Sequence, residues 1–281
     1  MEKIIVINDD SKESLHAAKY AFHLACHYHK HIVLANLVSA QRSMLNKVAR
    51  SKAVPVGIEL IHDEEEGPET VTDHLNCLNA GSDGFRPEIK TLDASEFCQR
   101  ELINYVNSHK VWLIVHGVTV ESEALNDEAR INMQSVLNRI QCPVMLIPPT
   151  AAPKKLERLV YLADLRYAQI PVINYLAKWR IEKESVVVAH ICAEGLSDLD
   201  KSYGDDLFNK ELSRKLACKN IIYSHLYTNS FSKLIDIVIH GMDADMIACM
   251  NHSYHLGQIL GSKINSAIPG YISVPVLVFP Y

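Results

Sequence analysis

Short apolar runs, repeated ten times along the chain, constrain its fold more than any other feature of the sequence. They form two series of five, and several are continuous stretches of valine and isoleucine, as in strands buried on both faces of a parallel sheet. The expected strands are residues 3–8, 31–38, 88–92, 111–117 and 143–148, and then 159–163, 185–192, 220–227, 245–250 and 275–280. The segments between them are long enough for the helical crossovers that parallel strands require.

The segment after the first expected strand has the clearest helical pattern. Asp10 or Ser11 is expected to cap this helix by accepting a hydrogen bond from a free backbone N–H, and Glu13 adds charge near its positive end. A core-facing stripe follows at three- and four-residue spacing: Leu15, Ala18, Phe22 and Ala25. The equivalent helix of the second series is expected to begin near Gln169, with Pro171 in its first turn. Strands that alternate with such helices predict an α/β fold.

The two series have the pattern of repeats of one unit. Each begins with a strand, an aspartate and a helix, and the aspartates are Asp9 and Asp164. Each ends in a similar strand, Cys-Pro-Val-Met-Leu-Ile-Pro at 142–148 and Val-Pro-Val-Leu-Val-Phe-Pro at 274–280. The length of 281 residues also favours two domains. We therefore expect the duplication of one five-stranded fold, with domains at residues 1–149 and 155–281 and a linker rich in proline, alanine and lysine between them.

The charge and the cysteines narrow the classes of partner and compartment. The net charge is −5 and the densest charged run, residues 63–66, is acidic, so we expect no nucleic-acid partner. Seven cysteines form no Cys-x-x-Cys pair, which favours a reducing compartment. The apolar run at residues 4–7 is too short for a signal peptide, and no segment approaches the ~20 apolar residues of a membrane helix. These features predict a cytoplasmic protein with no membrane partner.

The sequence offers no signature of catalysis or of a metal site. It has no Gly-x-Ser-x-Gly elbow and no Walker A motif, and no Gly-x-Gly-x-x-Gly follows either first strand. Cys192 and Cys249 lie in apolar runs and are expected to be core residues. Four side chains share a stripe of the first helix: His16, Tyr20, His23 and His27. Because no carboxylate lies on that stripe, a solvated face or an interface is favoured over a metal site. We expect no catalytic residue and no metal.

The residues that open and close each series resemble those of a known family. Residues 3–11, a strand ending in Asn-Asp-Asp-Ser before an alanine-rich helix, resemble the start of a universal stress protein domain. The closing strand of each series, with its flanking prolines, resembles the end of one. The resemblance covers essentially the whole chain as a tandem pair. It implies two five-stranded parallel sheets with helices on both faces, the adenine nucleotide alpha hydrolase-like fold, and an adenine-nucleotide site in some members.

The resemblance also implies where such a nucleotide binds. In nucleotide-binding relatives, an aspartate after the first strand helps to hold the base and ribose, and Asp9 and Asp164 correspond to it. The phosphates rest on a loop after the fourth strand with the pattern Gly, two residues, Gly, nine residues, Gly-Ser/Thr. Ligands of open α/β sheets bind at this carboxyl edge, and glycines before a helix start allow close approach to phosphate.

The first half departs from that pattern. After its fourth strand only Gly117 matches, and the loop that follows carries Glu121 and Glu123, which would repel a triphosphate. We therefore expect that the first half does not bind ATP in the usual way, and Asp9 is a minor candidate.

The second half retains more of the pattern. Gly261 and Ser262 lie where the closing Gly-Ser/Thr is expected, whereas Ala248 and Asn251 replace the earlier glycines. The polar loop at 251–258 could hold an anion at the start of the next helix. The candidate contacts for ATP or AMP are Asp164, Asn251, His252, Gly257, Gly261 and Ser262. The alternative is that Gly257 and Gly261 serve only a turn and a helix start.

The resemblance favours a non-enzymatic tandem universal stress protein, which acts in the stress response by binding a ligand or a partner. A weak ATPase or other nucleotide-handling enzyme and a ligand-free scaffold are the alternatives. Because sheet edges need partners and the last strand commonly mediates dimerisation in this family, strands 142–148 and 274–280 are expected to pair across a pseudo-two-fold axis. The chain would then form an internal pseudo-dimer, with which a further homodimer is compatible.

Overall fold

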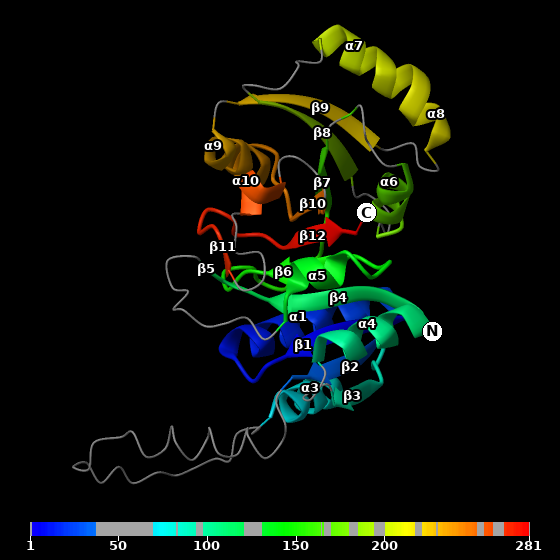
Figure 1. Ribbon diagram of the computed structural model, residues 1–281, viewed down its shortest axis with the longest axis vertical. Coiled ribbons are helices and arrows are strands. Elements are labelled where there is room, and N and C mark those ends of the chain that lie inside the picture. The colour runs from blue at the N-terminus through cyan, green and yellow to red at the C-terminus, as the bar shows by residue number, and fades with distance from the viewer. Residues whose placement is uncertain are drawn as a thin grey trace, which may run out of the picture.

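Ten strands of the computed structural model form one sheet with the order β3-β2-β1-β4-β6-β12-β10-β7-β8-β9 (Figure 1). The structure describes residues 2–37, 70–82, 84–93, 98–120, 131–163, 165, 170–179, 185–193, 200–216, 221–228, 230–251, 256–260 and 267–280. The first half of the sheet contains β1 (Lys3–Asn8), β2 (His31–Asn36), β3 (Ile89–Asp93), β4 (Val111–Gly117) and β6 (Val144–Ile147). The second half contains β7 (Arg158–Ala163), β8 (Ser185–Ala193), β9 (Ile221–Thr228), β10 (Met246–Met250) and β12 (Val276–Phe279).

All ten expected strands are confirmed, each within two residues of its predicted ends. Within each half every pair of neighbouring strands is parallel. Counted along the chain, each half has the same spatial order of strands, namely third, second, first, fourth and fifth. The α/β fold class expected from the sequence is therefore correct.

The two halves meet where β6 and β12 pair antiparallel, with Val278 opposite Val144 and Val276 opposite Leu146. The pairing expected of the two final strands is thus confirmed. A second, two-stranded sheet also joins the halves, because β5 (Thr119–Val120) pairs with β11 (Ala267–Ile268). We call the boundary formed by β6 and β12, with the side chains that meet across it, the seam. The strands of the two halves run in opposite directions across the seam.

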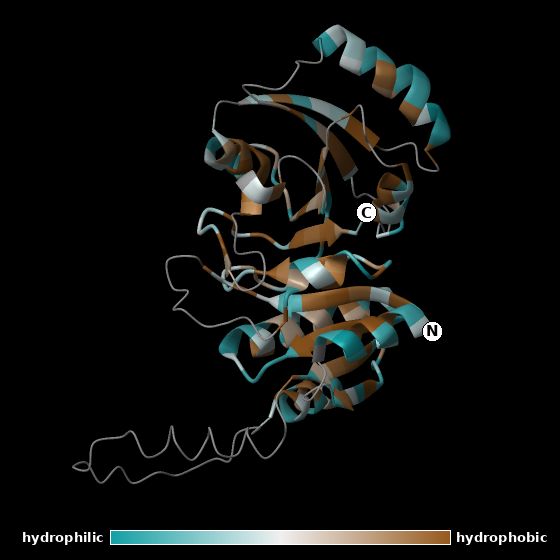
Figure 2. Ribbon diagram, viewed as in Figure 1, coloured by the Kyte–Doolittle hydropathy of each residue, from teal (hydrophilic) through white to brown (hydrophobic). Residues whose placement is uncertain are grey.

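Helices cover both faces of the sheet (Figure 1). One face carries α1 (Lys12–Tyr28), α3 (Val71–Ala80), α6 (Ile170–Ala177) and the π-helical η2 (Leu207–Leu212), which lies between α7 (Lys201–Asp206) and α8 (Ser213–Lys215). The other face carries α4 (Cys98–Ser108), α5 (Met133–Leu137), α9 (Phe231–Asp236), η3 (Ile237–Gly241) and α10 (Leu256–Leu260). Figure 2 shows apolar strands along the middle of the sheet and polar residues on the outer sides of the helices. Among the described residues, no helix has the length and apolar character needed to span a membrane.

The two hydrophobic cores are continuous across the seam. On one face Ile5 of β1 and Ile247 of β10 belong to the same cluster of buried residues. On the other face Val6 of β1 and Ala248 of β10 do so as well. Alternate residues of each strand point to opposite faces, so both faces of a central strand must be apolar. This requirement explains why the strands appear in the sequence as unbroken apolar runs.

Helix α1 begins at the cap that the sequence predicts, although one of its faces differs from the expectation. Ser11 is the cap residue, since its Oγ accepts a hydrogen bond of 3.0 Å from the backbone N–H of Ser14. Tyr20, which was expected on a solvated or interface stripe, is fully buried. His16 on the same stripe contacts the carbonyl oxygen of Ala151 through Nε2 at 2.9 Å. The stripe is therefore not solvated throughout, because Tyr20 is buried and His16 contacts the segment that connects the two halves.

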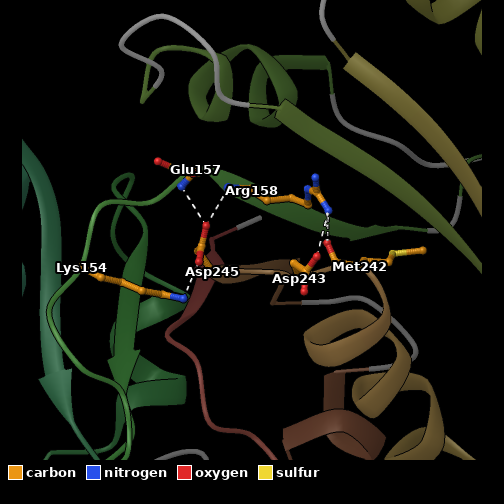
Figure 3. A network of polar contacts seen from close by, with 6 residues as sticks. All are labelled: Lys154, Glu157, Arg158, Met242, Asp243 and Asp245. Atoms are coloured by element: carbon orange, nitrogen blue, oxygen red, sulfur yellow. Dashed lines mark hydrogen bonds and ion pairs between the residues drawn. The ribbon is translucent and has the colours of Figure 1, made fainter.

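The connecting segment is anchored by Asp245, which directly precedes β10 (Figure 3). Its Oδ2 accepts hydrogen bonds from the backbone N–H groups of Glu157, at 2.8 Å, and of Arg158, at 2.9 Å. Its Oδ1 forms an ion pair with Lys154. The Arg158 guanidinium donates a 2.6 Å bond to the carbonyl oxygen of Met242. These contacts fix the end of the connecting segment to the amino-terminal edge of the second half.

An aromatic cluster crosses the seam on the α1 face. Tyr28 and Trp112 come from the first half, and Tyr175, Trp179 and Phe279 come from the second. The rings of Trp112 and Trp179 have centroids 4.5 Å apart. The Tyr28 hydroxyl donates a 2.9 Å bond to the Trp179 carbonyl, and the Tyr175 hydroxyl donates a 2.7 Å bond to the Trp112 carbonyl. Apolar packing and buried hydrogen bonds thus join the halves in addition to the strand pairing.

Candidate functional site

The strand order locates two candidate sites, one in each half. In open α/β sheets ligands bind beyond the carboxyl ends of the strands, where the strand order reverses. That position lies between β1 and β4 in the first half and between β7 and β10 in the second. Three of the candidate residues, Asp9, Asn251 and Gly257, are described by the structure. The other candidates lie outside the described residues: Asp164, His252, Gly261 and Ser262.

In the first half, Asp9 takes part in the turn that starts α1. Its Oδ1 accepts hydrogen bonds from the Ser11 backbone N–H, at 3.1 Å, and from the Ser11 hydroxyl, at 2.6 Å. Next to it, the Asn8 side chain donates to Asn36 of β2 at 2.8 Å and accepts from the Asp10 backbone N–H at 3.2 Å. The polar groups at this edge therefore bond to one another and support the cap of α1.

The same edge has little space at Gly117, the last residue of β4. A Cβ atom at this position would lie 2.2 Å from the carbonyl oxygen of Glu13 and 2.4 Å from its carbonyl carbon. The first turn of α1 therefore lies directly on the end of β4, where the strand order reverses. Gly117 is required for this close approach of two backbones.

In the second half, Asn251 directly follows β10 and is 5% exposed. Its Oδ1 accepts a 2.7 Å bond from Gln134 of α5, and its Nδ2 donates a 2.8 Å bond to Asn138, the residue that ends α5. Its backbone N–H donates to the carbonyl oxygen of Phe279 at 2.8 Å. Both ends of the Asn251 amide are thus engaged across the seam with residues of the first half. Sequence reasoning missed this bridge because nothing local marks Gln134 and Asn138 as its partners.

Gly257 lies in the first turn of α10 and is exposed. Among the described residues outside α10, no atom lies within 4 Å of the position that a Cβ would take. Gly257 therefore lies at a helix start, as the alternative to a ligand contact predicted. The local packing does not require glycine there.

A cavity of about 560 Å³ lies at the seam, next to the carboxyl edge of the second half. The first half contributes the end of α4 and the start of β4, and the second half contributes the first turns of α6 and the ends of β10 and β12. Trp112, Tyr175 and Phe279 supply aromatic surface, and Glu2 and Lys110 supply charged groups. Its size and mixed lining are typical of small-molecule sites. The sequence predicted that the final strands of the two halves would pair, and this pairing could have indicated a cavity between the halves.

Replacing Asn251 with alanine is expected to lower the free energy of unfolding by about 1–3 kcal/mol, because it removes two part-buried hydrogen bonds, one to Gln134 of α5 and one to Asn138, which caps α5. Denaturant titration of the full chain measures the change. Asn104→Ala is the matched control, since Asn104 is exposed on α4 and its loss should change stability by less than about 0.5 kcal/mol. Equal effects of the two substitutions would show that the bridge does not stabilise the seam.

Comparison with known proteins yields matches in structure but not in sequence. No family model and no curated protein matches the chain. A universal stress protein from Archaeoglobus fulgidus superposes with a TM-score of 0.61 and 14% identity, over 99% of this chain and 97% of the other. A functionally unknown protein from Pseudomonas aeruginosa PAO1 gives a TM-score of 0.52 and 13% identity, over 99% and 92%. A proposed universal stress protein from Pseudomonas aeruginosa UCBPP-PA14 gives 0.52 and 13%, over 99% and 93%.

These matches span both halves of the chain. At such low identity the matches establish the fold, and they do not establish the chemistry of the site. The family resemblance noted in the sequence is therefore confirmed at the level of structure: over nearly its whole length, this chain has the fold of the universal stress proteins.

Proposed function

We propose that the chain is a tandem universal stress protein that acts in the stress response by binding a ligand or a partner, and not by catalysis. The observation that carries the proposal is the structural match to the Archaeoglobus fulgidus protein over 99% of this chain. The two proposed units, residues 1–149 and 155–281, each supply five strands in the same spatial order. The antiparallel pairing of β6 with β12 supports the proposal that the units form an internal pseudo-dimer.

The proposed ligand is one adenine nucleotide, ATP or AMP, held in the second half. The contrast between the two carboxyl edges supports this assignment. In the first half the backbone of α1 lies against Gly117, and Asp9 is bonded to Ser11. In the second half no described atom beyond α10 itself crowds Gly257, and the carboxyl ends of β10 and β12 line the seam cavity. The further contacts proposed are Asp164, His252, Gly261 and Ser262. Asn251 can join them through the second lone pair of its Oδ1 or the second N–H of its Nδ2.

Calorimetric titration of the full chain with ATP and with AMP tests this proposal. We expect one site per chain and at least tenfold weaker binding in Asp164→Ala, because the aspartate that would hold the base and ribose is lost. Asp9→Ala, the same substitution in the first half, is the matched control and should leave the affinity unchanged.

No heat from either nucleotide at millimolar concentration would reject the nucleotide and leave binding of a partner as the proposed role. Equal losses of affinity in Asp9→Ala and Asp164→Ala would contradict the placement in the second half. Release of phosphate from ATP that disappears in Asp164→Ala would favour the weak ATPase instead.

A further inference from the structure

A thiol and an imidazole are in hydrogen-bond contact on the outer strands of the second half. The Cys192 Sγ, near the carboxyl end of β8, lies 3.2 Å from the Nε2 of His225 on β9. At this distance either the thiol donates to a neutral imidazole, or an imidazolium donates to the thiolate. A basic group in contact with a thiol is the arrangement that lets a cysteine act as a nucleophile.

This contact distinguishes Cys192 from the other buried cysteines that the structure describes. Cys142 and Cys249 are also buried, and burial raises the pKa of each thiol to about 12. Such thiols stay protonated near neutral pH and are poor nucleophiles. The expectation that Cys192 and Cys249 lie in the core is correct as to burial for both. Cys249 is buried in an apolar setting, whereas Cys192 is buried and also contacts His225.

Other ionisable groups surround the Cys192–His225 pair. The ring of His190, which lies opposite His225 in the strand register, meets the His225 ring edge-on with centroids 5.3 Å apart. The Tyr223 hydroxyl lies 3.4 Å from His225 Nδ1. Burial raises the pKa of Tyr223 to about 12, with smaller contributions from Asp205 and Cys192, so this hydroxyl is neutral near pH 7.

A carboxylate also lies within electrostatic reach of His225. The pKa of Asp200 is lowered mainly by hydrogen bonds from Ser202 and Tyr203, and in smaller part by interaction with His225. Asp200 therefore carries its charge at neutral pH, and its carboxylate is one of the charged groups around the Cys192–His225 pair.

We propose that Cys192 is a redox-active thiol, activated by His225, whose substrates are small peroxides such as hydrogen peroxide. The thiolate attacks one oxygen of the peroxide, and an S–O bond forms as the O–O bond breaks. The sulfur is oxidised by two electrons to the sulfenic acid, and the peroxide is reduced. The departing hydroxide takes the proton of the His225 imidazolium and leaves as water.

The position of the pair suits a small oxidant. Cys192 is 4% exposed, and hydrogen peroxide is not much larger than water, so a narrow opening is sufficient. His225 is half-buried on β9, which is the last strand in the sheet. Because Cys192 is so little exposed, larger electrophiles should react with it slowly. The thiols are therefore best labelled after the protein has been unfolded.

The test is a competition among the cysteines of one chain. The full-length protein is exposed to hydrogen peroxide at pH 7, catalase stops the reaction, and the remaining thiols are alkylated after unfolding and counted by peptide mass spectrometry. We expect Cys192 to lose its thiol at least tenfold faster than Cys249 and Cys142. Cys77, which is exposed, shows how far exposure alone promotes oxidation. Oxidation of Cys192 no faster than that of Cys249 overturns the proposal.

A substitution of the base separates activation from accessibility. His225→Gln keeps a polar side chain of similar reach but removes the base, and it should slow oxidation of Cys192 at least tenfold. Tyr227→Phe is the matched control, because Tyr227 lies on the same strand, is 63% exposed and should leave the rate unchanged. An unchanged rate in His225→Gln overturns the proposal.

The unmodified chain provides a second measurement in case His225→Gln does not fold. For free cysteine, with a pKa of about 8.5, the thiolate fraction rises roughly 75-fold between pH 6 and pH 8. If His225 holds Cys192 as a thiolate, its oxidation rate should rise less than tenfold over the same range. A rise as steep as that of free cysteine overturns the proposal.

Discussion

Replacing Trp179 with alanine is expected to lower the free energy of unfolding by about 3–5 kcal/mol, the usual cost of truncating a buried tryptophan. The indole is 1% exposed and packs against Tyr28 and Trp112 of the first half and against Tyr175 of the second. The substitution therefore leaves a cavity whose walls belong to both halves. Equilibrium unfolding in denaturant, followed by far-UV circular dichroism, measures the loss.

Tyr203→Ala is the matched control for Trp179→Ala. It also removes a large aromatic side chain from the second half, but Tyr203 is 58% exposed on α7. Its loss should change the free energy of unfolding by no more than about 0.5 kcal/mol. If the two substitutions had similar costs, the aromatic cluster would not contribute to holding the halves together.

Gly117→Ala is expected to lower the free energy of unfolding by about 3 kcal/mol, at the upper end of the usual cost of overpacking. The added Cβ would lie 2.2 Å from the carbonyl oxygen of Glu13. A flexible side chain could rotate away from such a contact, but a backbone carbonyl in the first turn of a helix cannot. The first turn of α1 would have to move away from β4. Thermal and denaturant unfolding of the variant measure the effect.

Gly257→Ala is the same substitution at a position with open space. In the part of the chain that the structure describes, no atom beyond α10 lies within 4 Å of the site of its Cβ, and the residue is in a helix. Alanine there is expected to raise the free energy of unfolding by about 0.5–1 kcal/mol, because glycine is a poor helix former. Opposite signs for Gly117→Ala and Gly257→Ala would support the close approach of α1 to β4. Two small effects of the same sign would contradict it.

The strands could be predicted from the sequence because each is buried on both faces. Residues 4–7 of β1 are all apolar, and all four are buried. The short strands β5 and β11 could not be predicted, because two residues carry no periodicity and their pairing depends on the seam. The stripe that contains Tyr20 was misplaced for a related reason. Tyr20 is buried and His16 contacts Ala151 of the connecting segment, and the pattern within α1 reveals neither.

The candidate site was harder to predict than the fold, because its contacts depend on which side chains meet across strands. Asn251 was expected at a phosphate loop, and the structure shows its amide bonded to Gln134 and Asn138 of the first half. Cys192 was expected in the core, and it is buried, but its contact with His225 follows from the register of β8 and β9. An apolar run predicts burial without specifying the register.

The opposite strand directions of β6 and β12 also limit what two bound molecules could do to each other. Because the carboxyl ends of the first five strands and of the last five emerge on opposite flanks of the molecule, one occupant would be separated from the other by the full length of the strands. Neither could pass a chemical group to the other or share a counter-ion with it. Any influence between them would have to travel as a mechanical displacement, through the row of strands or the helices packed upon it.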